Sequence, residues 1–162
     1  DVPPLPTLSK SRNKMGTDIN IKVERKQDGN WVESKSDRNF YDDRNYDLFS
    51  ALAGIRQRRT CKPITPIKPP QGWPKDSPNY KRYLDDMLPH NDSVGGHTWF
   101  TVKELLDWWH ENKNRHIMYY DDTNVLLHGE TYEDAMGYFF DDVAMGFGDD
   151  PDNVRILVRF YS

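Results

Sequence analysis

Hydrophobic and polar residues alternate in two segments that lie far apart in the chain. In TDINIKVERK, residues 17–26, one side of an extended chain carries Ile19, Ile21 and Val23. In VRILVRFYS, residues 154–162, the same alternation places Val154, Ile156, Val158 and Phe160 on one side. This period of two is typical of a half-buried strand. We therefore predict two strands that pair at the centre of a sheet, and DGN at residues 28–30 predicts a turn into a returning strand.

The other sides of these two strands carry charges of opposite sign. Asp18, Asn20 and Glu24 lie on the polar side of the first strand, and Arg155 and Arg159 on that of the second. If the strands pair, we expect these side chains to share an open face of the sheet. Opposite charges facing each other across a strand pair stabilise it by about 0.2–1 kcal/mol each.

Three segments show helical spacing and start signals. Tyr46, Phe49, Leu52 and Ala53 share a face after Asn45, which is a favourable N-cap. Thr101 and Glu104 form a capping box before the stripe of Val102, Leu105, Leu106 and Trp109. Thr131 caps a third segment, whose apolar face carries Tyr132, Met136, Phe139 and Val143. Trp108 lies beside the second stripe, and either a loop anchor or a binding platform explains it.

Between Thr60 and Pro89 the chain is interrupted by prolines, which fix φ and remove backbone donors: Pro63, Pro66, Pro69, Pro70, Pro74, Pro78 and Pro89. We predict a long surface loop, anchored by Trp73, Tyr80 and Tyr83 and containing one short helix within residues 79–88. The fold class is therefore α+β. A small, mainly antiparallel sheet has the first and last strands at its centre, two or three helices on one face, and the Pro-rich loop at the other face or an edge.

The chain of 162 residues suits a single domain. Residues 1–14, DVPPLPTLSKSRNK, are rich in proline, serine and basic residues. We interpret them as a flexible N-terminal extension of a single α+β domain at residues 15–162. The alternative is a Pro-rich docking arm.

Charge and cysteine content exclude several classes of function. The net charge is −4, with a pI of about 5.7, so the basic footprint of a general nucleic-acid-binding protein is missing. A local basic patch remains at Arg56, Arg58, Arg59 and Lys62. Cys61 is the single cysteine, which excludes an internal disulfide and a cysteine-based zinc site. A single cysteine fits a reducing compartment, so we expect a cytoplasmic protein. No apolar run approaches the roughly 20 residues that span a membrane.

Several sequence blocks resemble an uncharacterised family found in phages and bacteria. They are the start MG-x-D-I-x-x-x-V-E, then RNYDLFSALAGIR, the Pro-rich loop, HTWFTVKELL and DNVRILVRFYS, and together they cover nearly all of residues 15–162. The family pattern has histidine where this chain has Asn20. The resemblance implies a phage or prophage setting, and hence the cytosol of a host cell, and it supplies no catalytic residue.

Signatures of common catalytic and metal sites are missing. The sequence contains no GxxxxGK[ST], no GxGxxG after a strand and no GxSxG. Its five histidines include no H-x-x-x-H pair, and its paired aspartates suit solvated turns and helix ends. We therefore assign no catalytic residue, metal ligand or cofactor.

The leading hypothesis is a phage-type, non-enzymatic binding protein, with counter-defence as one role, that sequesters a small anionic, nucleotide-like ligand or binds a host protein. Arginine forks match phosphate geometry and aromatic rings stack on bases, and Arg44 has no evident structural role. The candidate ligand-binding residues are Arg44, Asn45, Tyr46, His97, Trp99, Arg155 and Arg159. Two alternatives stay open. One is a hydrolase of a phosphoester or nucleotide that uses Asp18, Asp47 and His97, with or without a metal. The other is a structural or assembly protein that forms homo-oligomers.

Overall fold

The computed structural model describes residues 16–87 and 95–162. Its main sheet has four strands in the order β2-β1-β6-β3, with β1 at Asp18–Gln27, β2 at Asn30–Glu33, β3 at Thr98–Thr101 and β6 at Val154–Tyr161. All neighbours are antiparallel. The predicted α+β class and the central pairing of the first and last strands are confirmed.

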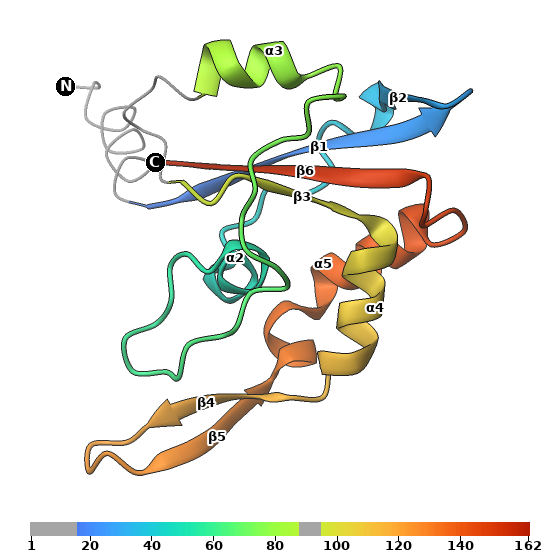
Figure 1. Ribbon diagram of the computed structural model, residues 1–162. Coiled ribbons are helices and arrows are strands. Elements are labelled where there is room, and N and C mark those ends of the chain that lie inside the picture. Colours follow the sequence, from blue (N-terminus) through green and yellow to red (C-terminus); the bar gives the residue numbers. More distant parts are fainter. Residues whose placement is uncertain (1–15, 88–94) are drawn as a thin grey trace, which may run out of the picture.

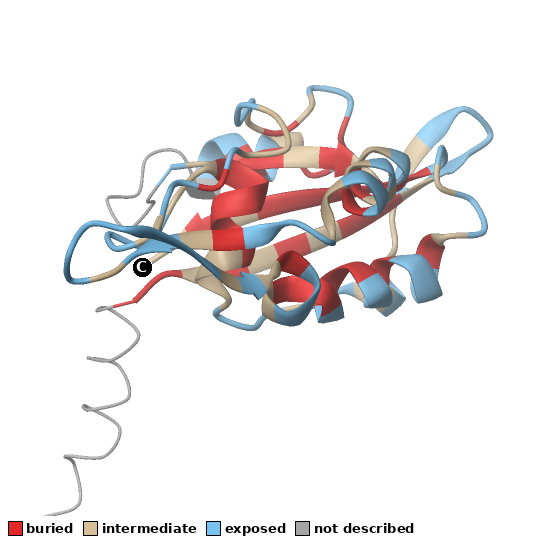
Figure 2. Ribbon diagram, turned by 90° about the horizontal axis from the view of Figure 1, so that it is seen from below, coloured by how far each residue is buried: buried red, intermediate tan, exposed pale blue. Residues whose placement is uncertain are grey.

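Three helices cover one face of this sheet (Figure 1): α2 at Tyr46–Ala53, α4 at Val102–Asn112 and α5 at Tyr132–Phe147. Their starts follow the predicted caps. Asn45 Oδ1 accepts from Leu48 N, Thr101 and Glu104 form a complete capping box, and Thr131 accepts from Asp134 N. The core lies between these helices and the alternating residues of β1 and β6, where Figure 2 shows the buried residues.

The opposite face of the sheet is covered by part of the Pro-rich loop. We call residues 73–83 the strap; it contains α3 at Tyr80–Arg82 and ends at Tyr83, the first residue of a π-helical segment at Tyr83–Met87. Trp73 is buried, its Nε1 donates to Val158 O at 3.0 Å, and its ring stacks on Tyr83. The predicted anchoring by Trp73 and Tyr83 is confirmed. The expectation of an open face around Arg155 is wrong, because the strap lies over it.

The sequence patterns did not predict four elements. A short 3₁₀ helix, η1, forms at Lys35–Asp37, and β3 extends the sheet directly before α4. The strands β4 at His116–Tyr120 and β5 at Leu126–Thr131 form a separate hairpin that projects from the helical side of the molecule (Figure 1).

Trp108 belongs to the main core. Its ring stacks on Tyr132 and contacts Phe140, both on α5, while Trp109 stacks on Phe140 at 4.3 Å between centroids. Residues 1–15 and 88–94 lie outside the described part, and with them the predicted boundary at residue 15 and the end of the predicted short helix.

Candidate functional site

Arg155 lies at the centre of a buried polar network. It faces Glu24 across the β1–β6 pair, and the two residues are 1% and 0% exposed. Arg155 Nε donates to Glu24 Oε1 at 2.8 Å, and Nη1 donates to Asp76 Oδ1 of the strap at 2.9 Å. The strap residues Ser77 and Asn79 donate to the other oxygen of Glu24. The predicted cross-strand pair therefore exists, and it joins the strap to the sheet.

Two indoles enclose the guanidinium of Arg155. Its Cζ lies 4.2 Å from the ring centroid of Trp31 and 5.3 Å from that of Trp99. Among the described residues, Nη2 has no hydrogen-bond partner. Trp99 and Arg155, both among the candidate ligand-binding residues, are thus brought together as a cation–π contact within the fold, where each ring contributes about 0.5–2 kcal/mol. This geometry leaves Arg155 little surface for a ligand.

Arg44 is paired as well. Its Nε and Nη2 donate to the two oxygens of Asp18 at 2.6 and 3.1 Å, a bidentate geometry, and this hydrogen bonding raises the pKa of Arg44. A Cβ at Gly16 would overlap the same guanidinium. Arg44 therefore does have a structural role, since it fixes the approach to β1.

Asn45 and Tyr46 serve the start of α2. Besides capping the helix, Asn45 donates through Nδ2 to Ala135 O of α5 at 2.8 Å. The hydroxyl of Tyr46 accepts from Thr17 N at 3.1 Å, and the guanidinium of Arg56 lies over its ring at 4.5 Å. These contacts account for both side chains as parts of the fold.

His97 and Arg159 lie next to each other on the strap side of the sheet. His97 directly precedes β3, where Thr98 pairs with Val158. It is buried with an edge contact to the ring of Tyr83, and its carbonyl accepts from Gly72 N. Burial lowers the pKa of His97, and the charge of Arg159 acts in the same direction. Arg159 is partly exposed and lies over the ring of Tyr161 at 4.8 Å.

The three residues of the hydrolase hypothesis have different partners. Asp18 pairs with Arg44, Asp47 pairs with Arg58 at 3.1 Å, and His97 contacts Tyr83. Within residues 16–87 and 95–162, no group of three or more metal-ligating side chains is present. The described geometry thus gives this hypothesis no assembled centre.

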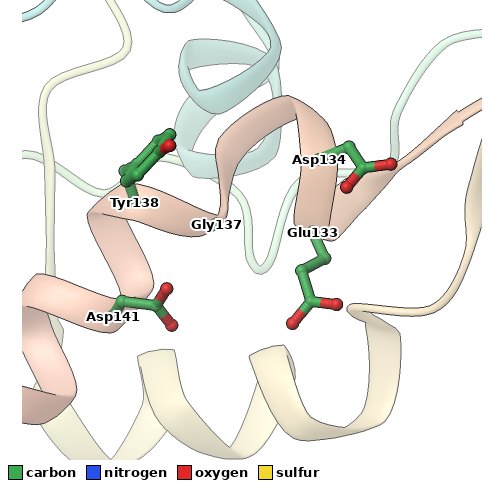
Figure 3. A pocket seen from close by; sticks show the side chains of 5 residues that line it. All are labelled: Glu133, Asp134, Gly137, Tyr138 and Asp141. Atoms are coloured by element: carbon green, nitrogen blue, oxygen red, sulfur yellow. The ribbon is translucent and has the colours of Figure 1, made fainter.

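Two pockets lie elsewhere, both lined by residues outside the seven candidates. One, of about 330 Å³, follows a single face of α5 and is acidic, with carboxylates from Glu133, Asp134 and Asp141 (Figure 3). The other, of about 210 Å³, lies at the base of the β4–β5 hairpin. We call it the hairpin-base pocket; its lining includes Lys62, Thr65, Arg115, His116, Met118 and Tyr132. The basic patch noted in the sequence contains Lys62, but no sequence pattern indicated that the other lining residues would lie near it.

The β4–β5 hairpin carries most of the exposed apolar side chains. Of the nine large hydrophobic residues that are exposed in the described part, five lie here: Tyr119, Tyr120, Val125, Leu126 and Leu127. The turn is rigid, because Asp121 Oδ1 accepts from the backbone N–H groups of Thr123 and Val125. Cross-strand pairing places Tyr119 beside Leu127 on one face of the hairpin and Tyr120 beside Leu126 on the other. Adjacent exposed apolar residues mark an interaction site more often than scattered ones do.

No helix within the described ranges combines the length and the apolar character needed to cross a bilayer. No family model matches the chain, and no curated protein or solved structure shows significant similarity to it.

Proposed function

We propose that this chain is a non-enzymatic binding protein that acts on another protein through the β4–β5 hairpin. The exposed side chains of Tyr119, Tyr120, Val125, Leu126 and Leu127 are the observation that carries the proposal. Apolar and aromatic residues dominate binding energy at protein interfaces. The resemblance to phage proteins makes proteins of a bacterial host cell the candidate partners.

For the residues that the structure describes, one edge of the hairpin is covered by the chain and the other is open to a partner. On the β4 side, Lys62 N donates to Met118 O at 2.8 Å and Tyr120 N donates to Thr60 O at 2.9 Å, so residues 60–62 cover that edge. In the described part of the chain, β5 pairs with β4 alone. An open edge beside apolar side chains suits the addition of a partner's strand, and a rigid hairpin lowers the entropy cost of binding.

The charges around the hairpin define the partner further. Asp121 and Asp122 lie at the turn, next to the apolar side chains. We infer a partner that presents an extended apolar segment with basic residues at the end that meets this turn. A second copy of this acidic chain, with its net charge of −4, fits less well.

The test compares affinity capture from bacterial extract by the native chain, by Leu126→Ser/Leu127→Ser and by Tyr138→Ser/Met145→Ser. The second double variant is a matched control, because its two residues are 85% and 86% exposed on α5, away from the hairpin. A protein captured by the native chain and the control, but reduced about tenfold or more by the hairpin variant, supports the proposal. Capture that is equal for all three contradicts it.

Light scattering on the same three proteins separates the assembly alternative. Concentration-dependent growth in mass that only the hairpin variant abolishes would make the hairpin a contact between copies. A monomeric mass over the full range of protein concentration would favour a different protein as the partner.

A further inference from the structure

We propose that the hairpin-base pocket binds a phosphate-type oxyanion. This inference does not depend on the protein-binding function, because it concerns different side chains. The pocket, of about 210 Å³, lies where three segments meet: the loop at Lys62–Thr65, the first residues of β4 and the first residue of α5.

Two cations line this pocket without a carboxylate partner in the described part of the chain. For Lys62, no ion pair or hydrogen bond of the ammonium group is formed with a described residue. For Arg115, Nη1 donates to the neutral amide oxygen of Asn112 at 3.2 Å, and the guanidinium lies 5.8 Å from the ring centroid of Tyr132. Both cations line the same pocket, and an anion bound between them would interact favourably with both charges.

A third lining residue, His116, comes from the start of β4. His116 Nδ1 lies 2.7 Å from Gly129 O, and a carbonyl oxygen only accepts, so Nδ1 carries the proton. The imidazole stacks on His128 with centroids 5.2 Å apart, which fixes its plane. His116 therefore lines the pocket with a ring whose orientation is set by Gly129 and His128.

Backbone hydrogen bonds hold the three walls in place. Lys62 N donates to Met118 O at 2.8 Å, which joins the loop to β4. Tyr132 N donates to Arg115 O at 2.8 Å, which joins α5 to the residue before β4. The cationic side chains therefore project from a fixed frame, and little backbone order has to be gained when an anion binds.

The composition of the lining points to the ligand class. A lysine supplies a compact point charge and an arginine supplies a planar fork, a combination that suits the several oxygens of a phosphate group. Thr65 adds a hydroxyl, while Met118 and Tyr132 give the pocket apolar wall. We infer a phosphate monoester with a small organic group, or inorganic phosphate, as the class of ligand.

The experiment is an NMR titration of the full chain, following backbone amide shifts at constant ionic strength. The probes are inorganic phosphate, phenyl phosphate and acetate. We expect saturable shifts at Lys62, Arg115 and His116 with inorganic phosphate, in the millimolar range. Tighter binding of phenyl phosphate would show that the apolar wall is used, and equal binding would assign the site to the free anion. Shifts that rise without saturation, or acetate binding as tightly as phosphate, would overturn the proposal.

Variants tie the response to the pocket. Lys62→Gln and Arg115→Gln should each weaken phosphate binding by about tenfold, because each removes a charge-assisted hydrogen bond. The matched controls are Lys75→Gln and Arg38→Gln, which remove exposed cations from other elements. Phosphate shifts that persist unchanged in both pocket variants refute the site. Both pocket residues are exposed, so these variants are expected to fold, and their amide spectra report this directly.

Discussion

Arg155 and Arg115 are the same residue type in opposite circumstances. Arg155 is 1% exposed, with two carboxylates and two indoles around its guanidinium. Arg115 is exposed, and its guanidinium donates to the neutral side-chain oxygen of Asn112. The first arginine joins the strap to the sheet, and the second lines a pocket. The comparison indicates that an arginine is available to a ligand where its neighbours supply no carboxylate to pair with it.

The largest effect in this comparison is expected from Arg155→Leu. The substitution leaves Glu24 buried without its cation, and breaking a buried pair in this way costs about 3–5 kcal/mol of unfolding free energy. Urea denaturation followed by circular dichroism measures the loss. Arg159→Leu, which removes a partly exposed cation from the same strand, should cost well under half as much. Equal losses of unfolding free energy in the two variants would mean that the hydrogen bonds to Glu24 do not stabilise the fold beyond the effect of removing an arginine.

A smaller effect is expected from Trp73→Phe, which tests how the strap is held. The change removes the donor to Val158 O and part of the stacking on Tyr83, and we expect strap opening to become easier by about 1–2 kcal/mol. Limited trypsin digestion at Lys75, Lys81 and Arg82 should then accelerate about tenfold, since 1.4 kcal/mol is a factor of ten. Tyr80→Phe keeps the ring and is the control. Unchanged cleavage in Trp73→Phe would show that other contacts hold the strap.

His97 should make the strap side of the sheet sensitive to acid. Its pKa in the folded protein is lowered by burial, so below about pH 6.5 the unfolded chain binds a proton more readily than the folded one. The stability associated with neutral His97 is present above that pH and is lost as the pH falls. Unfolding free energies at pH 7.5 and pH 5.0 should therefore differ less for His97→Gln than for the native chain. The exposed His110 gives a control, and a His97→Gln protein with the native pH slope would contradict this interpretation.

The smallest effect on stability is expected from Lys62→Gln and Arg115→Gln. Both side chains are exposed and lack a described carboxylate partner, so each change should alter the unfolding free energy by less than about 0.5 kcal/mol. Differential scanning calorimetry measures this. A stabilising change would fit the relief of repulsion between the two cations. A loss of unfolding free energy comparable to that of Arg155→Leu would show that Lys62 and Arg115 stabilise the fold.

The sequence was sufficient for the elements that carry a regular pattern. The alternation in β1 and β6 identified both the strands and their buried sides, and the caps at Asn45, Thr101 and Thr131 marked three helix starts. The hairpin was missed because Leu126 and Leu127 are adjacent and both exposed, which breaks the period of two.

The candidate site was less predictable for a physical reason. Alternation shows that Arg155 lies on the side opposite Ile156, but it does not show that a strap from residues 73–83 covers that side. Carboxylates from Asp18 and Asp76 come from distant segments to meet Arg44 and Arg155. The hairpin-base pocket likewise joins three segments, and only tertiary structure brings them together.

The central position of β6 has a consequence for how the chain acquires its structure. β1 finds its partner in β6, where Glu24 meets Arg155, so more than a hundred residues are synthesised between the two halves of this contact. During translation, β1 cannot pair with β6 until β6 has been synthesised, and β3 pairs with the same strand. Contacts of such long range close slowly. In a nascent chain that stops before Val154, Ile19, Ile21 and Val23 lie on a strand without its central partner. Exposed apolar surface and unpaired strand edges of this kind make an unfinished chain prone to aggregate.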